Sequence, residues 1–284
     1  MLETMMTLGV VLDQATTALA TAGVDAPRRE ATKLWAHVAQ RSTADVLLDR
    51  DALVADDMAT RYLAAVARRA AGEPLAYVTG WTGFRNLTLA CDPRALIPRP
   101  ETEGLIEAAL ARGASGLAAD VCTGTGAIAL SLRDEGNFAA VIGCDISTEA
   151  LALARENGRR TGLDVEWIAG DLVTPLRGRE VNLLVANPPY LTADEYRKLD
   201  ASVRDHEPML ALVSGDDGLD ATRRLLDEGR YVVAAGGWIA LELDCRRADA
   251  SAALAGSLGW SEIAVQDDLF GRARYLLARR ESTR

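Results

Sequence analysis

The segment Asn187-Pro-Pro-Tyr190 has the residue types needed to grip a flat NH2 group, and we call it the NH2 clamp. Its prolines fix the backbone and carry no N–H donors, so carbonyl oxygens remain as the exposed polar groups. The side-chain oxygen of Asn187 and the carbonyl of Pro188 can accept both hydrogens of an amide or amine, while Tyr190 stacks on its plane. Such a grip strengthens as the nitrogen leaves planarity, which favours the transition state. Asn187, Pro188 and Tyr190 are therefore the candidate catalytic residues, with an ordinary Pro-Pro turn as the alternative.

A glycine-rich turn follows a predicted strand and opens a predicted helix; it consists of Cys122, Thr123, Gly124, Thr125 and Gly126. Glycines let the backbone turn tightly and approach a ligand closely. The N-terminus of the following helix offers free N–H groups and a partial positive charge. That end would hold a pyrophosphate in a dinucleotide enzyme and would face the methionine carboxylate in a methyltransferase. The turn by itself also fits a purely structural role.

Two aspartates after later strands favour a cofactor that contains adenosine. Asp145 follows the second predicted strand, where it can accept hydrogen bonds from both ribose hydroxyls. Asp171 follows the third strand and can accept the adenine amino group, with Leu172 against the ring. A helix cap or a turn remains the alternative role for each aspartate.

These candidate residues depend on strands and helices that alternate from about residue 101 onward. Predicted strands lie at 117–121, 139–144, 165–168, 181–186, 238–243, 263–266 and 273–278. Predicted helices lie at 101–112, 148–160, 219–234 and 248–258, with another directly after Gly126. The run at 181–186 is nearly all apolar, as in a strand buried on both faces. This order predicts a doubly wound α/β sheet, whose ligand crevice lies at the carboxyl ends of the strands.

The first 75 residues differ from the rest of the chain. Apolar residues recur there at helical spacing, which predicts a small α-helical bundle. Residues 72–100 are rich in Gly and Pro, and a loose alternation within them predicts a hairpin or extended linker. We expect three parts, at 1–75, 76–98 and 99–284.

Composition excludes several classes of function. The chain has 284 residues and a formal net charge of −10, whereas nucleic-acid binding needs clustered Lys and Arg. Its 4 cysteines form no CxxC pair and its 2 histidines are far apart, so we expect neither a metal site nor a disulfide framework. No apolar run reaches the length of about 18 residues that a membrane span needs. We expect a cytoplasmic monomer that binds neither nucleic acid nor membrane.

Further segments carry a recognisable pattern: Glu73-Pro-Leu-Ala-Tyr77, Leu96-Ile-Pro-Arg-Pro-Glu-Thr-Glu103, Val203-Arg-Asp-His-Glu-Pro208, Leu210-Ala-Leu-Val-Ser-Gly215 and Asp268-Leu-Phe-Gly-Arg272. Together with the NH2 clamp they resemble the protein-(glutamine-N5) methyltransferase family that acts on peptide chain release factors. The clamp tetrapeptide is shared with adenine and cytosine amino methyltransferases, so it indicates the chemistry and not the substrate. Residues 97–103 are much more specific to the release-factor family.

The resemblance implies a seven-stranded, Rossmann-like class I methyltransferase domain, preceded by a helical substrate-recognition domain and a β-hairpin linker. It also implies a reaction, in which S-adenosyl-L-methionine methylates the side-chain amide of the glutamine in the Gly-Gly-Gln motif of a release factor. The reaction converts the cofactor into S-adenosyl-L-homocysteine.

Site residues follow from the resemblance position by position. The implied cofactor contacts are Cys122, Thr123, Gly124, Thr125, Gly126, Asp145, Asp171, Leu172 and Asn187. The implied substrate contacts are Asn187, Pro188, Pro189 and Tyr190, with Arg99 and Glu101 lining or bracing the entrance. An ion pair that locks the linker to the domain is the alternative role for Arg99 and Glu101.

Two positions depart from the family pattern: Cys122 and Leu243 stand where the family usually has glycine. Other functions therefore stay open. One is N-methylation of a small amide or amine, or of a nucleobase amino group in DNA or RNA. Another is a nicotinamide-dependent oxidoreductase, although the turn lacks the third glycine of GxGxxG. The last is a cofactor-binding scaffold without activity, which the intact NH2 clamp disfavours.

Overall fold

The computed structural model describes residues 6–281, and the chain divides into two compact units. One unit contains the chain up to Gly80 together with Ala201–His206, and the other contains Trp81–Asp200 together with the chain from Glu207 onward. Within residues 6–281, no helix combines the length and the apolar character that a membrane crossing requires.

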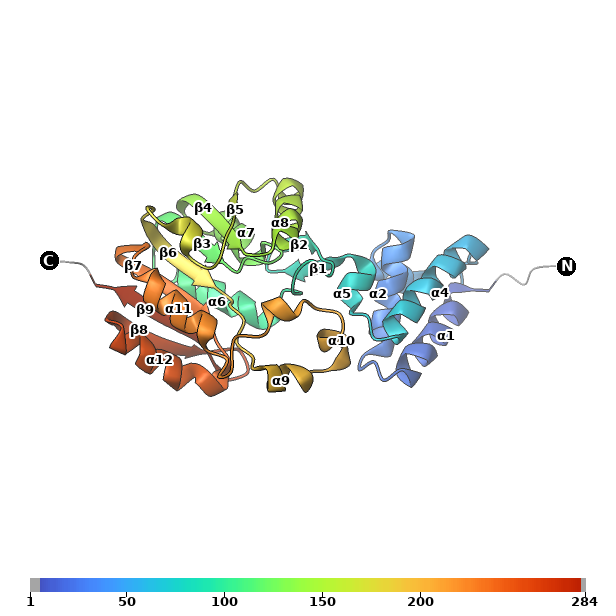
Figure 1. Ribbon diagram of the computed structural model, residues 1–284. Helices are drawn as coiled ribbons and strands as arrows, with labels where there is room; N and C mark the ends of the chain where they lie inside the picture. Colours follow the sequence, from blue (N-terminus) through green and yellow to red (C-terminus); the bar gives the residue numbers. More distant parts are fainter. Residues whose placement is uncertain (1–5, 282–284) are drawn as a thin grey trace. The chain divides into compact units, whose positions relative to one another are not determined.

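The N-terminal unit is built from helices: α1 (Leu8–Thr21), α2 (Pro27–Ala39), α3 (Thr43–Leu48), α4 (Asp56–Ala70), α5 (Leu75–Thr79) and α10 (Ala201–Arg204) (Figure 1). α2 begins at Pro27, because proline needs no hydrogen-bond partner in the first turn. α3 begins with a capping box made by Ser42 and Asp45. In the core, the rings of Trp35 and Tyr62 meet edge to face with centroids 5.0 Å apart. The predicted helical bundle is thereby confirmed.

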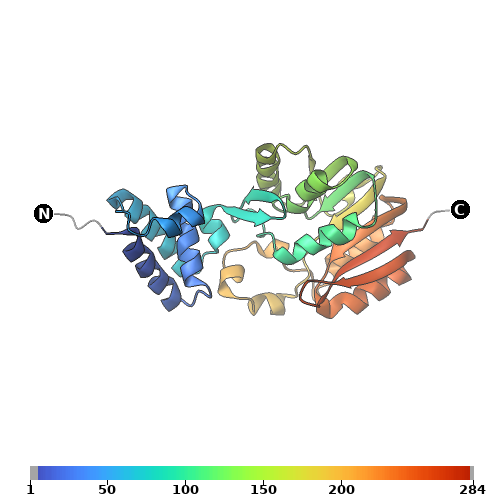
Figure 2. The same cartoon turned by 180° about the vertical axis from the view of Figure 1, so that it is seen from behind.

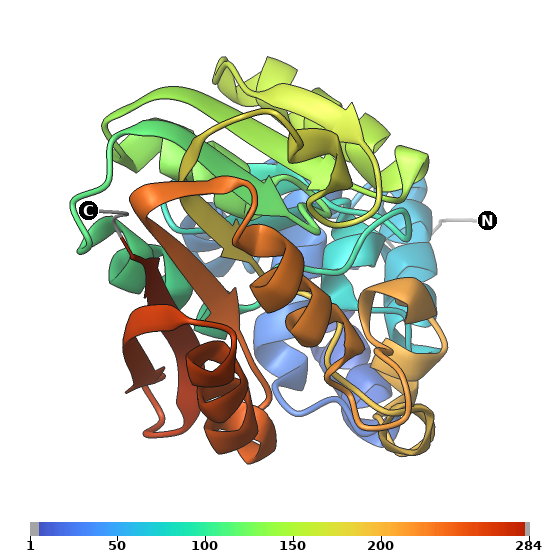
Figure 3. The ribbon, with the colours of Figure 1, turned by 60° about the vertical axis from the view of Figure 1, so that its left-hand side comes forward.

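The second unit contains a seven-stranded sheet in the order β5-β4-β3-β6-β7-β9-β8. Its strands are β3 (Gly116–Val121), β4 (Phe138–Asp145), β5 (Glu166–Ala169), β6 (Val181–Ala186), β7 (Val233–Glu242), β8 (Trp260–Asp267) and β9 (Ala273–Arg280). Neighbours from β5 to β7 are parallel, whereas β9 runs antiparallel to β7 and β8. Figure 3 shows the strands crossing the unit from the yellow-green β5 to the red β8.

Helices cover both faces of this sheet: α6 (Pro100–Leu110), α7 (Ala127–Glu135), α8 (Thr148–Thr161), α11 (Asp220–Gly229) and α12 (Ala248–Ser257). Leu105 of α6 and Leu130 of α7 belong to one apolar cluster. Leu225 of α11 and Ala255 of α12 belong to another. α11 and α12 lie in front of the sheet in Figure 1, and α6 lies in front of it in Figure 2. The expected doubly wound α/β fold is confirmed.

A β-hairpin precedes the sheet, as expected, and consists of β1 (Trp81–Phe84) and β2 (Leu87–Ala90) paired antiparallel. The segment between β6 and β7 contains α9 (Ala193–Arg197) and a 3₁₀ turn at Met209–Ala211, neither of which the apolar pattern predicts. Two further 3₁₀ turns lie at Thr174–Leu176 and Cys245–Arg247. The helix predicted over 219–234 is shorter, because α11 ends at Gly229 and β7 begins at Val233.

Candidate active site

The glycine-rich turn and the NH2 clamp begin side by side at the carboxyl edge of the sheet. Val121 at the end of β3 pairs with Ala186 at the end of β6. Cys122 and Asn187 are the first residues after these two paired strands, so the two loops start at adjacent positions. The strand order also reverses here, because the chain passes from β3 to β4 on one side and places β6 on the other. In open α/β sheets, such a reversal opens a ligand crevice.

A cavity of about 500 Å³ opens at this edge, within the usual size range of small-molecule sites. The site residues predicted from the sequence that line it are Arg99, Cys122, Thr123, Gly124, Thr125, Asp145, Asp171, Leu172, Asn187 and Pro189. Gly126, Glu101, Pro188 and Tyr190 lie outside its lining. The structure thus brings most of the predicted residues around one cavity.

A buried carboxylate anchors the glycine-rich turn from below. Oδ2 of Asp120 accepts the Thr123 hydroxyl at 2.5 Å and the backbone N–H of Ala129, in the first turn of α7, at 3.0 Å. The residue is fully buried, and Oδ1 has no hydrogen-bond partner in the described part of the chain. Burial raises the pKa of Asp120 to about 7. The turn is therefore held in place by a group that is costly to ionise.

The backbone of the turn explains why glycine is usual where Cys122 stands. Cys122 has a φ of 63°, in the left-handed region that favours glycine. Gly126 has a φ of 84°, and a Cβ there would lie 2.8 Å from the ring of Trp167. Burial also raises the pKa of the Cys122 thiol, so this side chain adds no charge to the cavity at neutral pH.

Asp145 links the glycine-rich turn to the start of α8. Its Oδ2 accepts the Gly124 N–H at 2.9 Å, and its Oδ1 accepts the Ser147 N–H at 2.9 Å. Each carboxylate oxygen keeps a second acceptor direction, so both can still accept hydroxyl hydrogens. Burial raises the pKa of Asp145, and these backbone hydrogen bonds oppose that rise.

Asp171 and Leu172 also line the cavity and follow β5 in the chain. Oδ2 of Asp171 forms an ion pair with Nη2 of Arg224 at 2.9 Å. Leu172 is buried and has a φ of 46°, a strained value for a side chain of this size. Asp171 therefore forms an ion pair with Arg224 and also lines the cavity.

The NH2 clamp follows β6, and in it Asn187 lines the cavity while Pro188 is buried. Nδ2 of Asn187 donates to Oγ1 of Thr102, 3.2 Å away in α6. The backbone N–H of Tyr190 donates to the carbonyl of Leu212 at 3.1 Å. Burial raises the pKa of Tyr190, so its phenol stays protonated. The expected stacking of Tyr190 on a substrate remains a prediction.

Two buried residues behind Asn187 were not predicted from the sequence. Thr102 is 4% exposed and lines the cavity, and its hydroxyl lowers the pKa of Glu242 at the end of β7 against the larger effect of burial. Glu242 is 1% exposed, and burial raises its pKa to about 7. A carboxylate inside the otherwise apolar end of β7 was the available signal, but its partner is distant in sequence.

Arg99 braces the entrance and lines it at the same time. Its Nη2 lies 2.5 Å from Oε1 of Glu207, whose Oε2 accepts the Ile97 N–H at 3.0 Å. Glu101 contributes its backbone carbonyl, which accepts the hydroxyl of Tyr275. The alternative role, an ion pair that locks the linker, thus applies to Arg99, with Glu207 as its partner.

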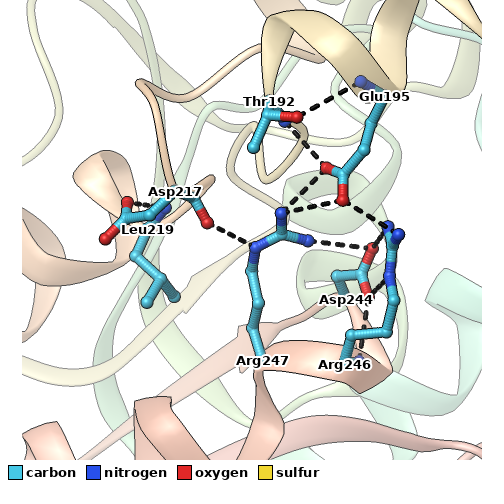
Figure 4. Close-up of polar contacts among 7 residues, drawn as sticks. All are labelled: Thr192, Glu195, Asp217, Leu219, Asp244, Arg246 and Arg247. Atoms are coloured by element: carbon cyan, nitrogen blue, oxygen red, sulfur yellow. Dashed lines mark hydrogen bonds and ion pairs between the residues drawn. The ribbon is translucent and has the colours of Figure 1, made fainter.

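Arg247 ties three segments together (Figure 4). Its Nη2 donates to both carboxylate oxygens of Glu195 at 3.0 and 2.8 Å. Its Nε donates to the carbonyl of Asp217 at 2.6 Å, and its Nη1 lies 3.2 Å from Asp244. Glu195 also forms the capping box of α9 with Thr192. The chain that leaves the clamp is thereby fixed to the end of β7.

Across residues 6–281, no group of three or more His, Cys, Asp or Glu side chains could hold a metal ion. The polar side chains that line the cavity are carboxylates, hydroxyls, three arginines and the amide of Asn187.

Comparison with known proteins finds two family models that match different parts of the chain. A family model described as PrmC N-terminal domain matches residues 11–80, and one described as Methyltransferase small domain matches residues 101–203. A release factor glutamine methyltransferase of Deinococcus radiodurans is 42% identical over 278 residues, covering 97% of this chain and 99% of that protein.

Another relative and a solved structure agree with this match. A release factor glutamine methyltransferase of Moorella thermoacetica is 41% identical over 281 residues, covering 97% of this chain and 99% of that protein. The crystal structure of a methyltransferase from Pyrococcus furiosus aligns with a TM-score of 0.55 and 19% identity, covering 80% of this chain and all of that one. This last likeness concerns the fold alone.

Proposed function

The chain belongs to the family of release factor glutamine methyltransferases, and on that premise we propose that it methylates the glutamine side-chain amide in the Gly-Gly-Gln motif of a peptide chain release factor. The observation that carries the proposal is the register of β3 and β6, which starts the glycine-rich turn and the NH2 clamp at adjacent positions. A cofactor held by the turn and an amide held by the clamp would therefore share one cavity.

The residues of the cavity fit S-adenosyl-L-methionine. The carboxylate of Asp145 can accept the ribose hydroxyls, and the glycine-rich turn allows close approach of the backbone. Asp171 and Leu172 would face the adenine, and Asn187 would border the methionine end. The neutral thiol of Cys122 is compatible with this use. When bound, S-adenosyl-L-methionine supplies a methyl group activated by a positively charged sulfur.

The chain's own contribution is orientation of the amide in a cavity partly shielded from water. Asn187 Oδ1 and the Pro188 carbonyl would accept the two amide hydrogens, and Tyr190 would flank the amide plane. Holding the nitrogen in line with the methyl group replaces a bimolecular encounter by a positioned one. A strong general base is not required, because the leaving group is neutral once the methyl group has left.

Other functions are less consistent with these findings. Relatives matched over nearly the whole chain are release factor glutamine methyltransferases, so an alternative substrate, such as a small amine or a nucleobase, is not supported. The NH2 clamp has no role in hydride transfer by an oxidoreductase. We also propose that the N-terminal helical unit recognises the release factor and that the enzyme acts as a monomer in the cytoplasm.

Mass spectrometry of a release factor incubated with the protein and S-adenosyl-L-methionine tests the proposal. We expect one added methyl group on the glutamine of Gly-Gly-Gln, and none when that glutamine is replaced by alanine. Asn187→Ala should lower turnover by about 100-fold or more, because it removes an acceptor that strengthens in the transition state. Its affinity for S-adenosyl-L-homocysteine, measured by calorimetry, should survive.

Asn137→Ala is the matched control, because Asn137 is exposed and does not line the cavity. It should methylate like the unmodified protein. Near-normal methylation by Asn187→Ala would contradict the role given to the clamp. If the protein with its natural sequence leaves the release factor unmethylated, the proposed function itself is contradicted.

A further inference from the structure

Glu242 presents a feature that packing alone does not explain. Its side chain is enclosed at the end of β7, and Oε2 has no hydrogen-bond partner within the described residues. Burying a carboxylate with an unpaired oxygen costs stability, and a native structure that keeps one calls for a reason. The hydroxyl of Thr102 favours the ionised form of this carboxyl, and its oxygen also accepts a hydrogen bond from Asn187.

Thr102 links the ionisation state of Glu242 to the orientation of the Asn187 amide in the NH2 clamp. The Thr102 hydroxyl carries a single hydrogen, and an ionised Glu242 can only accept it. The Thr102 oxygen must then act as the acceptor towards Asn187, whose Nδ2 lies 3.2 Å away. The amide nitrogen of Asn187 is thereby held at Thr102, and its Oδ1 is left for the cavity that Asn187 lines.

We propose that Glu242 and Thr102 are positioning residues, which fix the side chain of Asn187 so that its oxygen is presented to the substrate NH2 group. The inference rests on the proposed function, because it takes that NH2 group as the hydrogen-bond donor. Neither residue needs to touch substrate for this role. Their effect is confined to the orientation of one amide, which would otherwise be free to turn over.

Protonation of Glu242 reverses the chain of hydrogen bonds. A neutral carboxyl can donate to Oγ1 of Thr102, whose own hydrogen can then go to Oδ1 of Asn187. The amide turns over, and its NH2 group replaces its oxygen at the cavity. Because burial raises the pKa of Glu242 to about 7, this exchange falls in the neutral range.

Groups from every neighbouring element bear on this ionisation. Those that face Glu242 are Arg99 and Glu101 at the start of α6, Tyr190 in the clamp, and Arg274 and Tyr275 on β9. The two arginines favour the ionised carboxylate and Glu101 opposes it. Both tyrosines stay neutral, because burial raises the pKa of each. Neither tyrosine therefore adds a charge beside Glu242 near neutrality.

Thr102→Val and Thr102→Ser separate the hydroxyl from the shape of the side chain. We expect Thr102→Val to lower kcat for methylation of the release factor about 10- to 100-fold, because a misplaced acceptor weakens positioning. Its KM for S-adenosyl-L-methionine should change little. Thr102→Ser should restore most of kcat. Thr222→Val is the matched control, because it removes a buried hydroxyl in α11 that makes no hydrogen bond in the described structure.

The pH profile of kcat tests the positioning role, because a purely structural role of Thr102 and Glu242 would not make kcat depend on the ionisation of Glu242. With the natural residues, kcat should rise as the pH passes through about 7, where Glu242 ionises. Glu242→Gln can accept the Thr102 hydrogen at any pH, so the rise should disappear while activity remains. Thr102→Val should also lose the rise, at its lower kcat.

Two results would overturn the inference. One is Thr102→Val with normal kcat and an unchanged pH profile, and the other is Glu242→Gln with the rise still present. If Thr102→Val fails to bind S-adenosyl-L-homocysteine, the profile of Glu242→Gln decides. Failure of the proposed function is distinguishable, because the unmodified protein would then leave the release factor unmethylated.

Discussion

Asp120 provides a test of the electrostatics beneath the glycine-rich turn. Burial raises its pKa from 3.8 to about 7 in the folded protein. The native state therefore holds a proton that the unfolded state releases between about pH 4 and 7, so the free energy of unfolding falls as the pH rises through this window. The difference between the two pKa values corresponds to about 4 kcal/mol once the carboxyl is ionised in both states, as an upper bound.

Asp120→Asn should remove this dependence. The Asn oxygen can accept the same hydrogens from Thr123 and Ala129 that Oδ2 of Asp120 accepts. Its NH2 group would occupy the place of the unpaired Oδ1, at a cost of about 1–3 kcal/mol that does not vary with pH. The informative quantity is therefore the change in relative stability with pH. Relative to the natural protein, Asp120→Asn should gain stability from about pH 4 to about pH 7, and the gain should level off above that.

Urea denaturation of both proteins at a series of pH values measures the two free energies of unfolding. Asp134→Asn serves as the control, because Asp134 is an exposed aspartate of α7 and its replacement changes the formal charge equally. The control should show little of the gain. A stability difference between Asp120→Asn and the natural protein that stays constant with pH would refute the assignment of Asp120 as a buried, proton-holding anchor.

Two backbone predictions concern the loops of the site. Cys122→Gly should raise the free energy of unfolding in urea by up to about 1 kcal/mol, because it relieves a φ of 63°, whereas Cys91→Gly at a buried position of ordinary φ should lower it. Gly218→Ala should lower both stability and kcat, because its Cβ would lie 2.6 Å from the carbonyl oxygen of Tyr190. Gly178→Ala has a similar φ with nothing within 4 Å of its Cβ, so equal effects of the two alanines would contradict the proposed clash.

Periodicity and motif position were sufficient to predict the fold and the meeting of the main loops. Apolar runs such as the one in β6 predict strands buried on both faces, and in a parallel sheet the segments that follow them share one edge. That geometry alone places Cys122 and Asn187 near each other. Cys122 was recognisable as a departure from the family, and its left-handed φ supplies the physical reason.

Contacts between distant residues were beyond the reach of the sequence pattern. No periodic signal joins Thr102 to Glu242 or Arg99 to Glu207. The first pairing depends on how the start of α6 packs against the end of β7, and the second on how the segment between β6 and β7 folds over the residue before α6. The end of α11 was misplaced for a local reason. Apolar residues continue past Gly229 into β7, so hydrophobicity did not mark the boundary that the turn at Gly229 makes.

The two carboxylates beneath the site have one physical property in common. Asp120 supports the glycine-rich turn and Glu242 supports the NH2 clamp, and each has one oxygen without a partner in the described structure. Burial raises both pKa values to about 7, so ionisation of either one opposes folding. Apolar residues of similar volume at such positions are often more stable, yet they could not accept the hydrogens that hold Thr123 and Thr102. Their retention is therefore better explained by the orientation of the two loops than by stability, as expected where a fold departs from its own packing rules at a functional site.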